Sequence, residues 1–218
     1  MLRHDRRGFG LSSGRPSIAS DVSDAVALLD HAGVTGAVLI GASQGARVAV
    51  RVALRVAKRL GGLVLDAPPD EIGPGRGVQT DEIPLDLCRA LARQGDVASV
   101  RRMWSEHPFT RLVRADTDAE KRLASMIARY PGADLLEDPV PAPLGDVRTL
   151  AVPALVLNGE YDLPSRVAAG VALAKALPNA QHRVLRDAGH LANLDDPPAY
   201  DAALRAFVEA LPPNPHRC

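Results

Sequence analysis

The chain has 218 residues, of which 46% are hydrophobic and 24% charged, and 26 basic side chains balance 26 acidic ones. A net charge of zero provides no basic field to recruit nucleic acid, and no apolar run is long enough to span a membrane. These values argue against a nucleic-acid-binding or membrane protein and favour one globular domain with a sizeable core.

The compartment is predicted from the N-terminus and the cysteines. The opening stretch MLRHDRRGFG lacks the apolar segment of a secretory signal. Cys88 and Cys218 are far apart in the chain, so we expect free thiols rather than a disulfide framework. Both observations predict a cytoplasmic protein.

Strand-like and helix-like patterns alternate along most of the chain. Helical patterns cover 18–32, 46–60, 165–177 and 198–211, and strand-like runs cover 37–41, 63–69, 153–162 and 182–189. Strands alternating with helices predict right-handed crossovers and an α/β fold with a mostly parallel, doubly wound sheet. The run 37–41 is continuously apolar, as in a strand buried on both faces, and Gly61 and Gly62 are expected to end the second helix.

Residues 70–145 interrupt this alternation. The segment opens with the proline- and glycine-rich stretch DEIGPGRGVQTDEIP and closes with EDPVPAPLGD. Between them, helical patterns cover 85–94, 97–106 and 117–129. We interpret 70–145 as a helical cap or lid inserted into a core made of residues 1–69 and 146–218.

A candidate nucleophile, Ser43, lies in the Gly-x-Ser-x-Gly sequence GASQG at 41–45. This sequence follows an apolar strand and opens a helix, as a nucleophile elbow requires. The glycines permit a strained turn and leave room for a substrate beside the serine. A serine hydroxyl is a poor nucleophile at neutral pH and needs a base and an orienting acid. The alternative is that Ser43 is only a small residue in a tight turn.

A candidate base and acid follow two later strands. His190 comes just after the last predicted strand, and Asp162 ends the strand before it. Because loops after parallel strands gather at one edge of a sheet, both side chains can meet Ser43 there. Serine, aspartate and histidine also occur in the chain order expected for such a triad.

Each member of this triad has a simpler interpretation. Asp162 could cap the helix beginning near residue 165, and Glu160 is a rival acid. His190 could be a loop histidine held by Asp187 or Asp195. The conjunction of three residue types at three strand ends favours the catalytic interpretation.

The remaining histidines show no pair with metal-ligand spacing, so we expect no metal site. We interpret them as structural or surface residues, with His107 as a partial exception. His107, with Met103, Trp104 and Phe109, lies in the insertion and could line a pocket, although helix packing is the alternative. The glycine-rich stretch at 8–14 lacks the strand and acid of a dinucleotide-binding loop.

The motifs together resemble the α/β-hydrolase superfamily along the whole chain. HDRRGFGLSSG is similar to the turn after the family's fourth strand, GASQGA to its elbow, LNGEYD to its acid loop and AGHLANLDDP to its histidine loop. The resemblance is nearest to the small ester and lactone hydrolases that include 3-oxoadipate enol-lactonase and cofactor-free haloperoxidase-like enzymes. It implies Ser43 as nucleophile, His190 as base, Asp162 as acid and the backbone N–H of Gln44 as an oxyanion donor, without a cofactor.

By the same resemblance, Met1 falls inside the family's fourth strand. Strands one to three, and the loop that supplies a second oxyanion donor, are then missing. We expect the natural protein to carry residues upstream of Met1, and a truncated, weakened relative is the alternative. If the chain exists as written, a second copy could close the gap between MLRH and AVLIG as a homodimer.

The predicted function is hydrolysis of a small carboxylic ester or lactone through an acyl-enzyme on Ser43. The predicted oxyanion or substrate contacts are Gln44, Trp104 and His107. The expected partner is the small-molecule substrate, without nucleic acid or membrane. The alternatives are a haloperoxidase or perhydrolase, in which peroxide replaces water, and a truncated non-catalytic relative.

Overall fold

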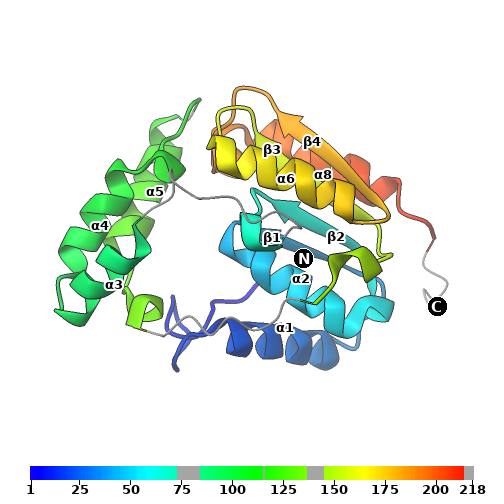
Figure 1. The fold of residues 1–218 in the computed structure, drawn as a ribbon, viewed down its shortest axis with the longest axis horizontal. Helices are drawn as coiled ribbons and strands as arrows, with labels where there is room; N and C mark the ends of the chain where they lie inside the picture. The colour runs from blue at the N-terminus through cyan, green and yellow to red at the C-terminus, as the bar shows by residue number, and fades with distance from the viewer. Residues whose placement is uncertain (73–83, 115, 137–144, 214–218) are drawn as a thin grey trace.

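The computed structural model describes residues 1–72, 84–114, 116–136 and 145–213. These residues form one sheet of four parallel strands in the order β1-β2-β3-β4 (Figure 1). The strands are β1 (Ala37–Ala42), β2 (Leu60–Asp66), β3 (Ala154–Gly159) and β4 (Ala180–Leu185). The parallel α/β sheet predicted from the sequence is confirmed.

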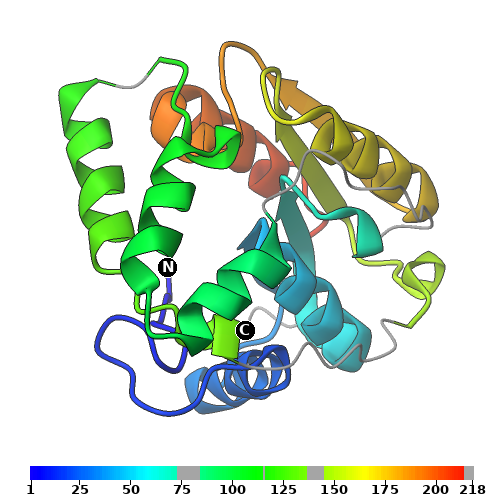
Figure 2. The ribbon, with the colours of Figure 1, turned by 60° about the vertical axis from the view of Figure 1, so that its left-hand side comes forward.

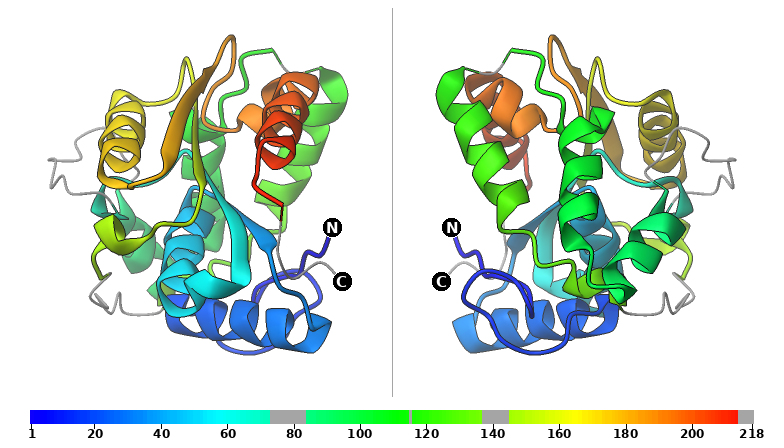
Figure 3. Two further views of the ribbon diagram at one scale, coloured as in Figure 1. Left: turned by 90° about the vertical axis from the view of Figure 1, so that its right-hand side faces the viewer. Right: turned by 90° about the vertical axis from the view of Figure 1, so that its left-hand side faces the viewer.

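Helices lie on both faces of this sheet (Figure 3). On one face are α2 (Gln44–Val56) and α6 (Pro164–Ala176), and α1 (Ile18–Ala32) packs on α2. On the other face, α8 (Pro197–Glu209) follows the short α7 (Ala192–Asp195). Short 3-10 turns are η1 (Ala57–Arg59), η2 (Asp70–Ile72), η3 (Pro108–Thr110), η4 (Ala133–Leu136) and η5 (Val147–Thr149). The arrangement is doubly wound, as expected.

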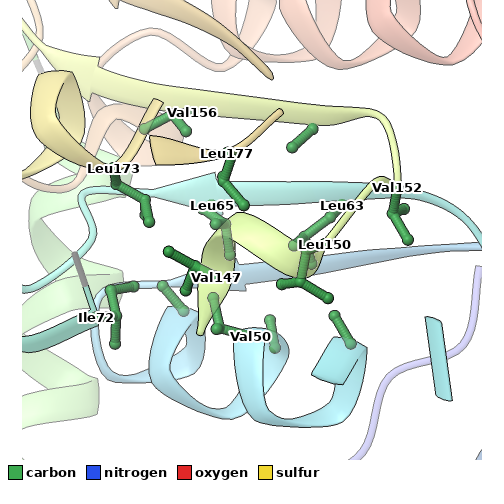
Figure 4. Packing of buried hydrophobic residues seen from close by; sticks show 14 of the residues in the cluster. Val50, Leu63, Leu65, Ile72, Val147, Leu150, Val152, Val156, Leu173 and Leu177 are labelled. Carbon is green, nitrogen blue, oxygen red and sulfur yellow. The ribbon is translucent and has the colours of Figure 1, made fainter. Parts of the chain in front are cut away.

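The larger apolar cluster lies between the sheet, α2 and α6 (Figure 4). Leu63 and Leu65 of β2 meet Val156 of β3, Val50 of α2 and Leu173 of α6, all fully buried. The alternate strand residues Val64, Leu155 and Leu157 face α8 instead. Both faces of β2 and β3 are therefore covered by helices.

The strand β1 differs from the prediction, because it is not buried on both faces. It lies at the edge of the sheet formed by the described residues, and Ile40 is 43% exposed. Residues 1–5 are exposed and form no strand beside it. An edge strand of a parallel sheet presents unpaired backbone groups along one side. Closure of this edge by a second copy of the chain stays a prediction.

Gly61 and Gly62 also differ from the prediction, because they lie inside β2 rather than ending a helix. A Cβ on Gly61 would lie 2.7 Å from the carbonyl oxygen of Gly36. One on Gly62 would lie 3.1 Å from the ring of Phe207 in α8. Close packing of the strand, rather than a chain reversal, therefore explains both glycines.

The helices of residues 85–128 form a group beside the sheet rather than on one of its faces (Figures 1 and 2). They are α3 (Leu85–Arg93), α4 (Val97–Glu106) and α5 (Thr117–Ala128). Cys88 and Val100 are buried in a small apolar cluster of their own. The predicted limits of this insertion at 70 and 145 stay a prediction, because 73–83 and 137–144 lie outside the described residues.

Three further features of the described residues concern membrane spans, thiols and metal clusters. In the described ranges, none of the helices has the length and apolar character needed to cross a membrane. Cys88 is a buried free thiol, whereas Cys218 lies outside the described residues. The same ranges contain no cluster of three or more His, Cys, Asp or Glu that could hold a metal ion.

Candidate active site

Ser43 lies in a strained turn between β1 and α2. Its φ of 50° and ψ of −115° are unfavourable for a residue with a Cβ. Its N–H donates to the carbonyl oxygen of Asp66 at 2.8 Å, which ties the turn to the end of β2. A Cβ on Gly41 would lie 2.3 Å from the carbonyl oxygen of Gly45, so the turn requires glycine at position 41. At Gly45 itself, a Cβ would meet no described atom within 4 Å.

Three strand ends bring Ser43, His190 and Asp162 together. The Nε2 atom of His190 lies 3.1 Å from Oγ of Ser43, and its Nδ1 atom lies 2.8 Å from Oδ1 of Asp162. The histidine is 6% exposed and the aspartate 7%, so the pair is shielded from water. The serine follows β1, the aspartate β3 and the histidine β4. A base in contact with a hydroxyl on one side and a carboxylate on the other is equipped for proton transfer.

The rival carboxylates have other partners. Glu160 is exposed, and its Oε2 atom accepts the backbone N–H of Asp187 at 3.1 Å. Asp195 accepts the backbone N–H of Gly189 at 2.7 Å. It is the Oδ1 atom of Asp162 that reaches the imidazole of His190.

The carboxylate of Asp162 is itself held by neighbours. Its Oδ1 atom accepts the N–H of Leu163 at 2.8 Å, and its Oδ2 atom lies 3.5 Å from Nδ2 of Asn158. The same amide donates to the carbonyl oxygen of Arg166 at 3.1 Å. The amide oxygen of Asn158 must therefore accept from Nε2 of His182, 3.0 Å away, which assigns that tautomer. Burial lowers the pKa of His182.

Asn158 and His182 were not expected at the site from the sequence. The asparagine is completely buried in an otherwise apolar strand. A polar residue inside the run ALVLNG was the available signal, since buried amides need partners.

Gln44 directly follows the candidate nucleophile. It is the first residue of α2, so its backbone N–H has no acceptor within the helix and lies at the positive end of the helix dipole. Its side-chain oxygen accepts from Nη1 of Arg6 at 2.6 Å. The Arg6 guanidinium also pairs with the buried Asp21 at 2.7 Å. The side chain of Gln44 is thus held by the N-terminal segment, and an oxyanion contact by its backbone N–H stays a prediction.

The insertion reaches the candidate site through Phe109. Its ring centroid lies 4.1 Å from that of His190, and the two ring planes are inclined by 30°. The guanidinium carbon of Arg166 lies 4.9 Å from the same centroid. The Nδ1 atom of His107 accepts the backbone N–H of Phe109 at 3.2 Å. His107 therefore supports the aromatic residue that covers the histidine.

Trp104 lies in the apolar cluster of the insertion. It packs edge-on against His107 and Tyr130, with centroids 6.3 and 6.4 Å apart. This packing agrees with the helix-packing alternative. A substrate contact by Trp104 or His107 stays a prediction.

Asp195 fastens the insertion to the loop that carries His190. Its Oδ2 atom accepts the N–H of Gly189, and its Oδ1 atom accepts the backbone N–H groups of Val113 and Arg114. The residue is 5% exposed, so water cannot easily replace these bonds. One buried carboxylate therefore sets the position of the insertion relative to the histidine loop.

We expect Asp195→Asn to loosen this connection. The amide NH₂ cannot accept, so at least one backbone N–H would lose its partner, at a cost of about 1–3 kcal/mol. The melting temperature should fall, and any reaction that uses the contact between His190 and Ser43 should slow by about 10-fold, because the histidine loop would be displaced. The exposed Asp146→Asn is the matched control. Equal behaviour of the two variants would contradict the role of Asp195.

A parallel α/β sheet that carries a strained serine turn and a histidine–carboxylate pair at its strand ends is the architecture of an α/β hydrolase. Residues 2–203 match the model of the alpha/beta hydrolase family. The chain belongs to that family.

Individual relatives are more distant. The chain is 28% identical over 196 residues to the 2-hydroxy-6-oxononadienedioate/2-hydroxy-6-oxononatrienedioate hydrolase of Paraburkholderia phymatum, over 83% of this chain. The match covers 65% of that hydrolase, so this chain spans less than two thirds of its length.

Solved structures give a similar result. A thermophilic esterase from Thermogutta terrifontis is 26% identical with a TM-score of 0.70, covering 94% of this chain and 78% of that one. Est816, described as an N-acyl homoserine lactone degrading enzyme, is 25% identical with a TM-score of 0.69, covering 93% and 80%.

Proposed function

We propose that the chain is a serine hydrolase acting on a small carboxylic ester or lactone, with Ser43 as nucleophile, His190 as base and Asp162 as acid. The carrying observation is the pair of contacts of 3.1 and 2.8 Å that aligns these three side chains. Similarity to an esterase and to a lactone-degrading enzyme supports this substrate class.

Acylation begins when Nε2 of His190 takes the proton of Ser43 as Oγ attacks the carbonyl carbon. The resulting oxyanion accepts the backbone N–H of Gln44 at the start of α2. Collapse of the tetrahedral intermediate breaks the bond to the leaving oxygen, which receives the proton from His190. The acyl group stays on Oγ, and in a lactone the released hydroxyl remains attached to it.

Deacylation repeats these steps with water. His190 takes a proton from water as the water oxygen attacks the acyl carbon. The second tetrahedral intermediate releases Oγ of Ser43, which regains the proton, and the carboxylic acid leaves. Throughout, Asp162 accepts from Nδ1–H, which keeps Nε2 free to accept a proton and stabilises the imidazolium.

Covalent labelling tests the nucleophile directly. We expect a fluorophosphonate probe to add once to the chain, as read by intact mass. Ser43→Ala should not be labelled, and His190→Ala should be labelled much more slowly than the wild type. Ser23→Ala, which removes an exposed serine of α1, is the matched control and should label normally. Equal labelling of the wild type and Ser43→Ala would contradict the proposal and favour the non-catalytic alternative.

Substrate class is tested with short p-nitrophenyl esters and a γ-lactone. Hydrolysis that disappears in Ser43→Ala supports the proposal, and the ratio of the two rates ranks ester against lactone. Peroxide-dependent halogenation of a dye in acetate buffer would instead favour the perhydrolase alternative, which uses the same three side chains.

A further inference from the structure

The imidazole of His190 has an aromatic neighbour that the mechanism above does not use. Phe109 lies in η3 of the insertion and is 5% exposed. Its ring centroid lies 4.1 Å from that of the imidazole, and the two planes are inclined by 30°. At this separation and inclination the rings are stacked in van der Waals contact. Phe109 thus lies on one face of the candidate base, whereas Ser43 and Asp162 meet the nitrogens at its edge.

The contacts at the two nitrogens restrain one movement of the imidazole only weakly. Rotation about the Cβ–Cγ bond carries Nδ1 and Nε2 out of the ring plane in opposite directions, away from Asp162 and Ser43. Hydrogen bonds oppose this rotation gradually, since they weaken steeply only when the angle at the hydrogen falls below about 120°. A contact on the ring face opposes it at once, because one edge of the imidazole would be driven into the phenyl ring.

The ring of Phe109 is itself held from two sides. Within the insertion, Nδ1 of His107 accepts the backbone N–H of Phe109 at 3.2 Å, and the hydroxyl of Thr110 donates to the carbonyl oxygen of His107 at 2.9 Å. From α6, the guanidinium carbon of Arg166 lies 4.9 Å from the ring centroid, and Arg166 is 4% exposed. A buried cation on an aromatic ring is attracted to it. The backbone turn and the cation together limit the movement of the phenyl ring.

The same contacts join the insertion to the loops that carry the acid and the base. The carbonyl oxygen of Arg166 accepts from Nδ2 of Asn158 at 3.1 Å, and this amide nitrogen lies 3.5 Å from Oδ2 of Asp162. On the histidine loop, a Cβ on Gly189 would lie 3.2 Å from the carbonyl oxygen of Arg111. The backbone of the insertion is therefore packed against the residue that precedes His190.

We propose that Phe109 is a positioning residue, which fixes the plane of the His190 imidazole between Ser43 and Asp162. This inference rests on the proposed function, in which His190 moves the proton of Ser43. It gives the insertion a part in the proton transfer, beyond any contact with substrate. A misplacement of about 1 Å between reacting groups costs on the order of 100-fold in rate. An imidazole without the stack keeps both hydrogen-bond partners but is aligned with them for a smaller part of the time.

The main test replaces the flat ring by an apolar side chain without a face. For Phe109→Leu we expect the fluorophosphonate labelling rate, and kcat for a p-nitrophenyl ester, to fall by about 10-fold. KM should stay within about twofold of the wild type, because the lost interaction is one that matters during proton transfer. Phe109→Tyr restores a ring at this position and should recover most of both rates. A residue that only binds substrate would instead raise KM and leave kcat unchanged.

Two further variants separate positioning from packing. Phe207→Leu makes the same change at a buried phenylalanine of α8, which packs against Gly62 in β2. It should lower the melting temperature but leave the labelling rate unchanged. Thr110→Val removes a hydroxyl that orders the turn around Phe109 and leaves the ring in place. It should give a smaller loss of rate in the same direction, and it replaces Phe109→Leu in the test if that variant does not fold.

NMR relaxation of the His190 imidazole in the full chain makes the inference independent of activity. Its resonances are assigned as those missing in His190→Gln, and the order parameter reports how tightly the ring is held. If the wild type is not labelled at Ser43, the proposed function fails, and the order parameter still decides whether Phe109 holds the imidazole.

A fall in the imidazole order parameter in Phe109→Leu and Thr110→Val, with the wild-type value kept in Phe109→Tyr and Phe207→Leu, supports the inference. Unchanged imidazole order in Phe109→Leu, or an equal fall in Phe207→Leu, would overturn it. In a wild type that is labelled, an unchanged labelling rate in Phe109→Leu would overturn it as well.

Discussion

Asp162→Asn should reduce kcat/KM for a p-nitrophenyl ester by about 10⁴-fold while the protein stays folded. The carboxylate holds Nδ1 of His190 as a donor, which leaves Nε2 free to accept from Ser43. An amide can donate to Nδ1 instead, and the ring then carries its proton on Nε2, which cannot accept. The volume of the side chain is preserved, so the loss should come from the wrong tautomer rather than from unfolding.

Glu160→Gln is the matched control for this substitution. Glu160 precedes Asp162 by two residues, directly follows β3 and was the rival acid in the sequence, but it is exposed and accepts the backbone N–H of Asp187. We expect its variant to retain activity within about twofold of the wild type, since a single exposed contact contributes little. A larger loss in Glu160→Gln than in Asp162→Asn would show that the acid has been assigned wrongly.

The candidate triad could be predicted because parallel strands fix where their following loops lie. More than a hundred residues separate Ser43 from Asp162 and His190, yet each of the three follows a strand of one parallel sheet. Once those strands are recognised from apolar runs, the meeting of the three side chains follows from topology. No knowledge of loop conformation was required, only the direction of the strands.

Residues that act through contacts between distant segments could not be predicted in this way. Phe109 is one of several aromatic or histidine side chains in the insertion, and only the packing of the insertion against the histidine loop places it on His190. Asp66 likewise gave a weak signal, a single acid in the run LVLDAPP. Its position could be assigned to a strand end, but the hydrogen bond that its carbonyl oxygen accepts from Ser43 depends on how β1 and β2 pair.

The errors at β1 and β2 have a common origin. An apolar run indicates a strand that is covered on both faces, so 37–41 was expected to be buried. In the structure, β1 lies at the edge of the described sheet and Ile40 is 43% exposed. Two consecutive glycines were expected to end a helix because glycine is common there. In the structure, Gly61 and Gly62 instead allow β2 to approach its neighbours closely. Local patterns do not distinguish a turn glycine from a packing glycine.

We expect the second large loss of activity for Gly159→Ala, because Gly159 is also a glycine required by close packing. Gly159 ends β3 beside the histidine loop, where an added Cβ would lie 2.1 Å from the carbonyl oxygen of Gly189 and 2.4 Å from that of Ala188. Both are backbone atoms, so the loops that carry Asp162 and His190 would have to separate. A displacement of about 1 Å between reacting groups costs on the order of 100-fold in rate. We therefore expect at least this loss in kcat/KM, with a destabilisation of about 1–3 kcal/mol from overpacking.

Gly45→Ala provides the comparison for stability, because its Cβ would meet no described atom within 4 Å. Its melting temperature should not fall, whereas that of Gly159→Ala should fall by several degrees. The imidazole of His190 reports the local effect, since its resonances should lose the signature of the contact between Nδ1 and Asp162 in Gly159→Ala. If Gly159→Ala kept both that contact and full activity, the two loops would have to be compliant. That result would contradict the hypothesis that the proposed chemistry depends on a fixed placement of the two loops.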